Sequence, residues 1–582
     1  GYTLRTPGGG RERFDIAWSR ELLADLEAIR RPGCDARVVQ AVGEQLRRAL
    51  KPAGWDELGR RLHAASAEGP VIVTLRSSAA ELYALPWELL TVGPSGQHLG
   101  ELPGVLLCHE WPGTTTLAEC PDPRPEGGRI LVAWSAAGGG VPAAEHVRAI
   151  AEACSEGHVD FDMSHDVLAN ASVAGLADAL AAAAAAGRPF AVLHLLCHGG
   201  LRGGDFGLVF DGADGAPALV DAGRLRQVLA PHADSVRLVV LAACDGGNVG
   251  DPGNYLGSVA QALHRARFAA VIASRYPLSV RGSVALTRTL YRALLVDLRS
   301  LEQAFLAARA ALARDEQHLE WASLQLYARE DDGADTRPCV IRPYRGLLPF
   351  EAAHRRFFFG RDAELREVLG DLQALRDADA PRFLFVAGAS GTGKSSLVLS
   401  SVVPELQRRE PPWEAAIMRP GNRPLAALDA ALAARRDGSR PFLLVVDQFE
   451  EVFTHGEPAD RGSFVRRLWA LASGATGIDC ILTIRVDFLA RCGELVLDDA
   501  GLCLDRIAYD EAHRVFVART GRAQVRAAIV GPAEQVGLVF EPGLVDRILA
   551  DVGDEPGALP LLQVALDRLW SCRVGRTLTA GA

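Results

Sequence analysis

The sequence predicts an α/β protein made of two consecutive domains, and three observations support this prediction. The chain has 582 residues, which is too long for one compact core, since a domain commonly holds roughly 100 to 200 residues. Short apolar runs alternate with helical stretches, a pattern typical of parallel sheets flanked by helices. An acidic segment with Gly and Pro at residues 331–343 interrupts this pattern. We therefore expect a first domain over residues 1–335, a linker over 336–350 and a second domain over 351–582.

The strands of both sheets are expected in short runs of apolar residues bounded by turn signals. In the first domain these runs are Val71–Leu75, Ile130–Trp134, Phe190–Cys197, Leu238–Ala242 and Ala269–Ala273, and in the second they are Phe383–Ala387, Phe442–Val446 and Cys480–Ile484. Residues 1–120 contain amphipathic helices and one strand. We expect this N-terminal part to cap a sheet formed within residues 121–335.

Composition and charge narrow the possible functions. The chain is 49% apolar and 23% charged, which is ordinary for a soluble globular protein. A net charge of −10 argues against a general nucleic-acid binder, so no direct nucleic-acid contact is expected. With no run of roughly 18 strongly apolar residues, no membrane span is expected. The 11 cysteines are scattered singly without a CxxC pair, which is typical of a reducing compartment and predicts a cytoplasmic location.

Two apolar runs in the first domain each lead to a residue with acid–base or nucleophilic chemistry. Residues 190–197 lead to His198 and Gly199, and residues 237–243 lead to Cys244. If these strands are neighbours in a parallel sheet, the imidazole and the thiol meet across one strand spacing, about 4.8 Å. Histidine can raise the thiolate fraction, and the glycines can free backbone N–H groups for an oxyanion. This arrangement predicts acyl transfer through a thioester, most simply peptide hydrolysis.

Other interpretations of these residues stay open. A lone cysteine at a strand end is commonly a small core residue, and a histidine before glycines is commonly a hydrogen-bonded structural group. His194, Cys197 and His198 could also suggest zinc, although strand alternation places Cys197 on the opposite face from both histidines. Asp205 and Asp245 are candidate acids of a specificity pocket, with solvated loop carboxylates as the alternative.

Further motifs accompany the histidine and the cysteine in order, over about residues 60–328. They are Leu85-Pro-Trp-Glu-Leu-Leu90, His194-Leu-Leu-Cys-His198-Gly199, Leu241-Ala-Ala-Cys244, Ala273-Ser-Arg-Tyr-Pro277 and Trp321-Ala-Ser-Leu-Gln-Leu326. As an ordered set they resemble the motifs of CHAT-type caspase-like cysteine proteases (clan CD). The resemblance implies a caspase-like sheet with flanking helices, Cys244 as the nucleophile and His198 as its base or orienting group. It also implies an oxyanion hole formed by the N–H groups of Gly199 and Cys244.

Two departures from the family pattern limit what the resemblance implies. Many relatives carry an acidic residue shortly after the Tyr-Pro pair, and residues 278–281 offer none. Ala242 stands two residues before Cys244, where metacaspases place a pocket aspartate. A preference for a basic residue before the cleaved bond is therefore not carried over to this chain.

A phosphate-binding motif opens the second domain. The run Phe383–Ala387 is followed by Gly388-Ala-Ser-Gly-Thr-Gly-Lys394-Ser395 and then by a helical stretch, which fits G-x-x-x-x-G-K-[ST] in its required context. Lys394 would reach the β- and γ-phosphates and Ser395 a magnesium ion, while backbone N–H groups face the phosphates. In a chain with only two lysines, a chance lysine at this place is improbable. The expected nucleotide contacts are Gly388, Ser390, Gly391, Thr392, Gly393, Lys394, Ser395 and Ser396.

A second apolar strand of this domain ends at acidic residues. Asp447 follows the run Phe442–Val446, where it can hold Mg²⁺ through water together with Ser395. Glu450 or Glu451 could polarise an attacking water, with an acidic helix start as the structural alternative. Arg485 ends the strand that contains Thr483 and Ile484, and it is either a γ-phosphate sensor or part of a surface salt bridge. The expected cofactors are ATP or ADP with Mg²⁺.

Three segments on either side of the phosphate loop together indicate a family resemblance for the second domain. They are Arg345-Gly-Leu347 with Phe358-Phe359-Gly360-Arg361, then Asp447-Gln-Phe-Glu-Glu451, then Pro556-Gly-Ala-Leu-Pro560-Leu561. Over about residues 343–571 this set resembles the STAND branch of AAA+-like signalling ATPases. The resemblance implies that Phe359, Gly360, Arg361 and Pro560 lie near the adenine base. Relatives usually continue into a winged helix and ligand-sensing repeats, so we expect the region that senses a trigger to be absent from this chain or removed, because it ends at Ala582.

The two resemblances together predict an ATP/ADP-switched caspase-like cysteine endopeptidase that acts as a bacterial-type immune or stress-signalling effector. Its expected partners are a protein substrate, an unknown trigger and, on activation, further copies of the same chain. The alternative is a STAND signalling scaffold whose caspase-like domain is a non-catalytic interaction module. A third possibility is an ATPase motor that remodels a partner.

Overall fold

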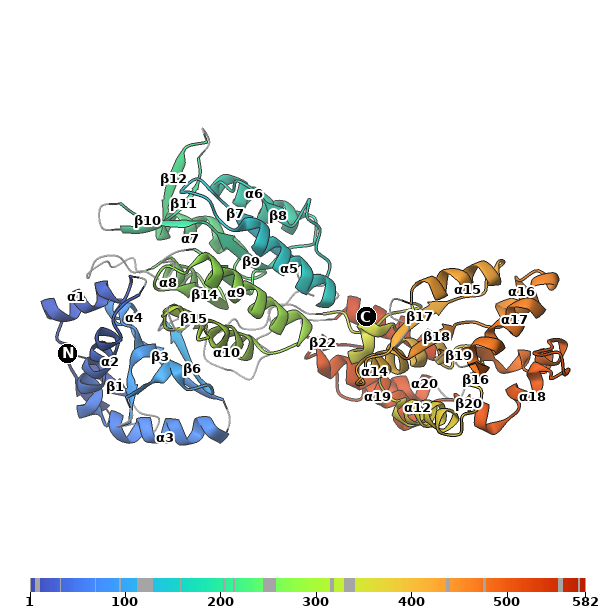
Figure 1. Cartoon of the computed structure of the whole chain (residues 1–582). Coiled ribbons are helices and arrows are strands. Elements are labelled where there is room, and N and C mark those ends of the chain that lie inside the picture. Colours follow the sequence, from blue (N-terminus) through green and yellow to red (C-terminus); the bar gives the residue numbers. More distant parts are fainter. Residues whose placement is uncertain are drawn as a thin grey trace. The chain divides into compact units, whose positions relative to one another are not determined.

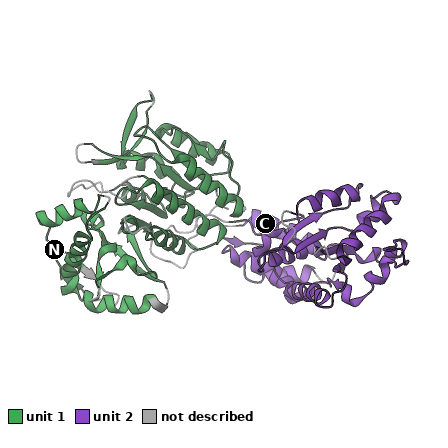
Figure 2. Cartoon of the chain, in the orientation of Figure 1, with its two compact units in different colours: residues 1–341 green, residues 342–582 purple. Residues whose placement is uncertain are grey.

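The computed structural model forms two compact units, residues 1–341 and residues 342–582 (Figure 2). Each unit is built around its own β-sheet. The described residues are 2–5, 11–31, 33–68, 70–93, 96–111, 129–157, 159–202, 205–212, 215–243, 258–314, 319–328, 341–435, 440–474, 478–552, 558–573 and 576–580.

An eight-stranded sheet forms the centre of unit 1 (Figure 1). From edge to edge its strands are β3 (Val71–Arg76), β6 (Val105–Glu110), β15 (Leu324–Ala328), β14 (Ala270–Ser274), β13 (Leu238–Leu241), β9 (Phe190–Leu196), β7 (Arg129–Trp134) and β8 (Val167–Leu168). The strands from β14 to β8 are mutually parallel. β15 is antiparallel to β14 and parallel to β6, which in turn is parallel to β3. The sheet is therefore mixed, with one change of direction between β14 and β15.

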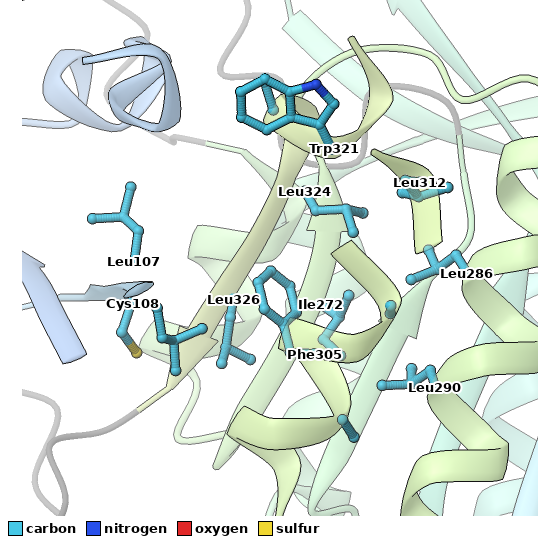
Figure 3. Close-up of a cluster of buried hydrophobic side chains, with 14 of the residues drawn as sticks. Leu107, Cys108, Ile272, Leu286, Leu290, Phe305, Leu312, Trp321, Leu324 and Leu326 are labelled. Carbon is cyan, nitrogen blue, oxygen red and sulfur yellow. The ribbon is translucent and has the colours of Figure 1, made fainter. Parts of the chain in front are cut away.

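The central strands are continuous apolar runs because both faces of the sheet are covered by helices. One face packs against α5 (Ala143–Gly157), α9 (Val280–Tyr291) and α10 (Leu301–Leu312). The other face packs against α6 (Val173–Ala185), α7 (Ala222–Leu229) and α8 (Val259–Arg265). Figure 3 shows the first of these cores, in which side chains of β6, β14 and β15 meet those of α9 and α10.

The N-terminal part extends the sheet, so the expectation that it only caps the sheet with one strand is wrong. β3 and β6 both belong to the central sheet, and β6 pairs with β15, which comes more than 200 residues later. The run of β6 ends in His109 and Glu110, both buried, and these polar residues shorten its apolar signal in the sequence. Three helices accompany this part: α1 (Arg20–Ala28), α2 (Ala36–Leu50) and α3 (Trp55–Glu68).

Several small elements complete unit 1. A three-stranded antiparallel sheet is formed by β10 (His198–Arg202), β11 (Asp205–Asp211) and β12 (Pro217–Asp221), and it begins directly after β9. The short elements near the N-terminus are β1 (Tyr2–Arg5), β2 (Arg11–Phe14), α4 (Glu81–Ala84), β4 (Thr91–Val92) and β5 (Gln97–His98), and α11 (Glu320–Ser323) precedes β15.

Unit 2 is a parallel α/β domain. Its sheet has the order β17 (Glu414–Met418), β18 (Phe442–Val446), β19 (Ile478–Arg485), β16 (Phe383–Gly388) and β20 (Arg514–Phe516), and every neighbouring pair is parallel. Helices cover both faces. They include α12 (Asp362–Asp377), α13 (Lys394–Leu397), α14 (Val403–Gln407), α15 (Pro424–Ala433), α16 (Glu451–Thr454) and α17 (Pro458–Ser473).

The C-terminal part of unit 2 is mainly helical. It contains α18 (Leu504–Ala508), α19 (Arg522–Gln535), α20 (Leu544–Val552) and α21 (Ala558–Ser571), with the short pair β21 (Val539–Phe540) and β22 (Thr577–Leu578). Every strand run predicted from the sequence forms a strand in one of the two main sheets. Along the described residues, no helix is long and apolar enough to cross a membrane.

The segment predicted as a linker over residues 336–350 divides into two parts. Its first residues, 336–340, lie outside the described residues. From Arg342 on it packs onto unit 2, where the hydroxyl of buried Tyr344 donates to the carbonyl of Ile529 at 2.7 Å and the guanidinium of Arg342 pairs with Asp567. Phe350 is also buried. These residues therefore contribute to the core of unit 2.

Candidate functional site

The carboxyl end of β9 presents His198 at the edge of the unit 1 sheet. All seven residues of β9 are buried, which anchors the strand firmly below this histidine. The ring of His198 lies against two glycines of the loop that follows β7: a Cβ at Gly138 would stand 2.9 Å from the Cβ of His198, and one at Gly139 would stand 3.3 Å from its Nε2. Nε2 is buried and has no hydrogen-bond partner among the described residues. This nitrogen is therefore free, within that part of the chain, to bond to a thiol or a substrate.

The strand that leads to Cys244 lies directly beside β9. In the parallel pairing of β13 with β9, Val240 stands opposite His194, and the N–H of Ala242 donates to the carbonyl of Leu195 at 2.9 Å. The predicted adjacency of the two strands is thus confirmed. The described stretch 215–243 stops at Ala243, so Cys244 lies outside the described residues, as does Asp245. The nucleophile and its distance from His198 remain predictions.

The other predicted residues of this site are placed only in part. Gly199 lies in β10, where it stands opposite Leu208 of β11. Its role as an oxyanion donor stays a prediction. Asp205 begins β11, and its side chain lies outside the described residues.

His194 belongs to a buried polar network on the opposite side of β9 from Cys197. Its Nε2 lies 3.0 Å from Nδ1 of His146 and its Nδ1 lies 3.2 Å from the hydroxyl of Tyr291. Cys197 packs in the hydrophobic core of the other sheet face. Burial lowers the pKa of His146 to about 4 and lowers the pKa of His194 well below its ordinary value. Among the described residues, no group of three or more His, Cys, Asp or Glu side chains could hold a metal ion.

Three of the motif segments meet around a buried ion pair that joins two of them. Nη1 of Arg275, from the Ser-Arg-Tyr-Pro motif, lies 2.7 Å from Oε2 of Glu88 in the Pro-Trp-Glu-Leu motif. The backbone N–H of Arg275 donates to the carbonyl of Ser323 in the Trp-Ala-Ser motif at 2.7 Å. A buried charge pair requires close geometry to offset its desolvation. These motifs therefore hold the end of β14 in a defined place, next to the end of β13.

The phosphate loop of unit 2 has the curved backbone that its glycines predict. Gly391 and Gly393 have φ values of +75° and +87°, in the left-handed region that favours glycine. Nζ of Lys394 lies inside this curve and donates to the carbonyls of Gly388 at 3.0 Å and Ala389 at 2.8 Å. Burial lowers the pKa of Lys394. The loop thus holds its lysine where a phosphate group would face the backbone N–H groups.

The two predicted magnesium residues are in contact. Oγ of Ser395 donates to Oδ1 of buried Asp447 at 2.5 Å. Thr483 on the neighbouring strand β19 also donates to this oxygen, at 2.8 Å, and accepts from the N–H of Gln448. A hydroxyl and a carboxylate are the hard oxygen ligands that Mg²⁺ prefers. Together with the lysine in the loop, these residues fit a magnesium-bound nucleotide.

The three charged residues proposed for catalysis and sensing have different surroundings. Oε2 of Glu450 accepts from the backbone N–H of Arg485 at 3.3 Å. Burial raises the pKa of Glu450, while nearby Lys394 and Arg485 act in the opposite direction. Glu451 instead accepts from the N–H of Gly421, in the loop after β17. The guanidinium of Arg485 pairs with Asp487, which agrees with a salt bridge and leaves the sensor role a prediction.

The segment expected beside adenine reaches the phosphate loop through Arg361. Nη2 of this buried arginine donates to the carbonyl of Thr392 at 2.8 Å, and Nη1 donates to the carbonyl of Ala518 at 3.0 Å. Gly360 has a φ of +83°, and a Cβ there would lie 2.5 Å from the carbonyl of Gln524. Phe359 packs closely against Gly531 of α19. Pro560 lies in the first turn of α21, and its position near a base stays a prediction.

Sequence reasoning missed four contributors to these sites. The glycine run at residues 138–140 after β7 was a visible signal, because glycines after a strand often allow close approach of another group. Thr483 and Arg419 both contact Asp447, and Arg419 does so through Nε at 3.2 Å from Oδ2. Ser274 donates to the carbonyl of Ala243. Single hydroxyls and arginines at strand ends carry no pattern that distinguishes them in a sequence.

Family comparisons agree with the two motif sets. The family model for CHAT domains matches residues 40–329. The family model described as novel STAND NTPase 1 matches residues 343–582. The chain joins a CHAT domain to a STAND NTPase domain. The CHAT match supports a cysteine-peptidase-like fold for unit 1, and the STAND match supports nucleotide binding by unit 2.

Solved structures similar to the chain include several ATPases. Domain III of the Thermotoga maritima replication initiation protein DnaA is 11% identical, with a TM-score of 0.27, over 36% of this chain and 82% of that one. The Walker-type ATPase PABY2304 of Pyrococcus abyssi is 15% identical, with a TM-score of 0.28, over 40% and 72%. The Thermotoga maritima Holliday junction motor RuvB is 13% identical, with a TM-score of 0.25, over 39% and 65%. No curated protein matches the chain.

Proposed function

We propose that this protein is a cysteine endopeptidase whose activity is switched by the nucleotide state of its STAND domain. The single observation that carries the proposal is the edge formed by β9 and β13. At that edge Nε2 of His198 is buried and has no hydrogen-bond partner among the described residues, and it lies beside β13, whose chain continues through Ala243 to Cys244. A thiol delivered there would have its base within reach.

The proposed chemistry is peptide hydrolysis through a thioester. His198 takes the proton of the Cys244 thiol, and the sulfur forms a bond to the carbonyl carbon of the substrate. The carbonyl electron pair moves to oxygen, where the N–H groups of Gly199 and Cys244 stabilise the negative charge. His198 then gives its proton to the amine as the C–N bond breaks. Water, deprotonated by His198, finally attacks the thioester and releases the acid and the thiol.

The STAND domain supplies the proposed control. Lys394, Ser395 and Asp447 would hold Mg²⁺ and the phosphates, and the bound nucleotide would supply an energetic difference between an ADP state and an ATP state. Arg361 connects the phosphate loop to Ala518, in the segment between β20 and α19. In this proposal a change at the phosphates is passed through Arg361 to that segment and from there to α19. In this proposal the ADP state keeps the peptidase silent, and a trigger with ATP promotes assembly of several copies.

The peptidase assignment is tested by comparing new protein chain termini produced in lysate by the wild-type chain and by Cys244→Ala. We expect termini that depend on Cys244, and the same loss with His198→Ala. Lys394→Ala should impair nucleotide binding and leave alkylation of Cys244 by iodoacetamide unchanged. If Cys244→Ala leaves cleavage intact, the peptidase proposal fails. A chain that binds ATP but shows no Cys244-dependent cleavage under any nucleotide would instead act as a signalling scaffold.

The switch is tested separately by cleavage rates with ATP, with ADP and without nucleotide. We expect low activity in ADP and higher activity when trigger and ATP are both present. Full activity of the isolated chain regardless of nucleotide would contradict the switch and leave the peptidase assignment standing. We further propose an immune or stress-signalling role in the cytoplasm, with a protein as substrate. Localisation of the tagged chain and survival of cells that carry Cys244→Ala under stress test this role.

A further inference from the structure

An arginine holds one oxygen of the carboxylate that is expected to bind magnesium. Arg419 directly follows β17, and Asp447 directly follows the neighbouring strand β18. Nε and Nη2 of Arg419 each lie 3.2 Å from Oδ2 of Asp447. The other oxygen, Oδ1, accepts from the hydroxyls of Ser395 and Thr483. Both oxygens of this carboxylate therefore have partners from the chain itself.

The pairing of the two strands places the arginine beside the carboxylate. β17 and β18 are parallel, and the N–H of Asp447 donates to the carbonyl of Met418 at 2.8 Å. The next residue is Arg419, so it leaves the sheet at the level of Asp447. Two residues later, the N–H of Gly421 donates to Oε2 of Glu451 at 3.0 Å, which holds the connection after β17 against the acidic motif. The sheet and this connection together keep the guanidinium within reach of the carboxylate.

Arg419 compensates the charge of a buried group. Asp447 is buried, and a buried charge is strongly unfavourable unless a group of opposite sign pairs with it. Along the described residues, Arg419 is the only cationic side chain in an ion pair with Asp447. Nζ of Lys394 bonds to carbonyls of its own loop, and the guanidinium of Arg485 pairs with Asp487. The compensation at the carboxylate therefore depends on Arg419.

The arginine is also able to leave the carboxylate. The side chain of Arg419 is 51% exposed, whereas that of Asp447 is 1% exposed. The guanidinium can therefore move into solvent without disturbing a packed core. A cation that binds Asp447 supplies the same compensation, so Arg419 and Mg²⁺ are alternative partners of one carboxylate.

We propose that Arg419 takes the place of Mg²⁺ beside Asp447, so that the site binds a nucleoside diphosphate with or without the ion. This inference rests on the proposed nucleotide control by the STAND domain and does not depend on the peptidase. If the arginine is removed, the phosphates of a metal-free nucleotide face an uncompensated carboxylate, whose repulsion weakens their binding. When Mg²⁺ accompanies the nucleotide, the ion supplies the positive charge and the arginine is not needed.

The test measures the affinity of the full chain for the fluorescent nucleotide N-methylanthraniloyl-ADP, in excess EDTA and in excess MgCl₂. Arg419→Gln removes the charge beside Asp447. Arg423→Gln is the matched control, because Arg423 is an exposed arginine in the same connection between β17 and α15. Arg419→Lys keeps the positive charge but loses the planar pair of donors. Thermal unfolding of each variant reports its folding.

We expect the wild-type chain to bind the nucleotide with affinities that differ by less than about threefold between EDTA and MgCl₂. In EDTA, Arg419→Gln should bind about tenfold more weakly than the wild type, since one compensating charge near the phosphates is lost. In MgCl₂ these two proteins should agree within about twofold, because the ion replaces that charge. Arg423→Gln should match the wild type in both solutions, and Arg419→Lys should lie between the wild type and Arg419→Gln in EDTA.

Three results would overturn the inference. Binding by the wild type in MgCl₂ but not in EDTA would show that the arginine does not replace the ion. Wild-type affinity of Arg419→Gln in EDTA would show that its charge is not required. Equal weakening of Arg419→Gln in both solutions would show a general role in nucleotide contact or folding.

Failure of the proposed function looks different from failure of this inference. A wild-type chain that binds the nucleotide in neither solution would remove the nucleotide control and this inference together. The expected affinities combined with cleavage rates that ignore the nucleotide would contradict the switch alone and leave the role of Arg419 standing.

Discussion

The two units place their chemistry at the carboxyl ends of parallel strands, yet they build these sites in different ways. In unit 2 one continuous loop curls around Lys394 with its own carbonyls. One carboxylate, Asp447, has three partners there, which are Ser395 in α13, Arg419 just after β17 and Thr483 in β19. In unit 1 the imidazole of His198 depends on glycines from one strand connection, and the residue before Cys244 depends on a serine from another strand. A site that one loop makes is visible in the sequence, whereas a site assembled from distant strands is only partly visible.

The largest expected effect is in unit 1. Gly138→Val places a branched side chain where even a Cβ would lie 2.9 Å from His198, so the ring must move. We expect peptide cleavage to fall by at least about 100-fold, with ATP binding unchanged. Gly140→Ala is the control, because a Cβ at Gly140 meets nothing within 4 Å. Cleavage by Gly138→Val at the wild-type rate would contradict the dependence of His198 on this loop.

The buried histidine pair predicts that unit 1 loses stability in acid. The pKa of His146 falls from an ordinary 6.5 to about 4 on burial, so below pH 6.5 the unfolded chain binds a proton that the folded unit does not. The stability should therefore decline as the pH falls from about 6.5 to about 4, by about 3 kcal/mol for this residue. Chemical denaturation of unit 1 at these two pH values measures the change.

Two variants serve as comparisons for this pH effect. His146→Gln should reduce the pH dependence, since the titrating group is gone. His63→Gln, at an exposed position, should leave it unchanged. A pH profile of His146→Gln identical to that of the wild type would assign the acid sensitivity to other groups.

A tenfold effect is expected in unit 2. Thr483→Val keeps the shape of the side chain but removes the hydroxyl that bridges Asp447 and the N–H of Gln448. We expect the rate of ATP hydrolysis to fall by about tenfold, because a buried carboxylate oxygen loses a hydrogen bond. The rate at which iodoacetamide alkylates Cys244 should not change. Thr454→Val, on the exposed surface of α16, is the control, and an equal loss in both variants would contradict the prediction.

The smallest expected effect concerns Arg419. Its guanidinium pairs with Oδ2 of Asp447 at 3.2 Å, so it competes with a magnesium ion for that carboxylate. Arg419→Gln should therefore lower the Mg²⁺ concentration needed for half-maximal ATP hydrolysis by about threefold. Arg467→Gln breaks a surface pair with Asp429 and should leave the Mg²⁺ requirement unchanged. A higher Mg²⁺ requirement in Arg419→Gln would show that the arginine helps the ion instead.

Much of the fold and of the nucleotide site could be predicted from the sequence, because the relevant signals are local. The runs that became β16, β18 and β19 are apolar from end to end, and the phosphate loop fits a spacing fixed by backbone geometry. β6 was missed because its last residues are polar, and only pairing with the remote β15 explains its burial. The sequence predicts a linker that includes residues 342–350, because Arg and Pro stand at its first positions and the contact of Tyr344 with Ile529 is not local.

The proposed catalytic edge of unit 1 could be predicted at the level of strands and residue types. The alternation of β9 correctly separated His194 from Cys197, since that period is a property of the strand itself. The glycines against His198 come from the loop after β7, about 60 residues earlier in the sequence, and Ser274 at the end of β14 stands 31 residues after Ala243, whose carbonyl it contacts. Neither the periodicity nor the composition of a local segment can predict contacts between residues so far apart in the sequence.

The place of β15 in the unit 1 sheet has a consequence for synthesis. Among the described residues β15 is the last strand of that unit, and within them it alone joins the β3–β6 pair to the five strands from β14 to β8. A nascent chain that stops before Leu324 therefore carries two separate half-sheets, each with an open edge that invites pairing with another chain. The two half-sheets cannot join until β15 has been synthesised. A prematurely terminated chain would therefore expose unpaired strand edges, and the ends of β14 and β13 would lack the support that β15 gives them.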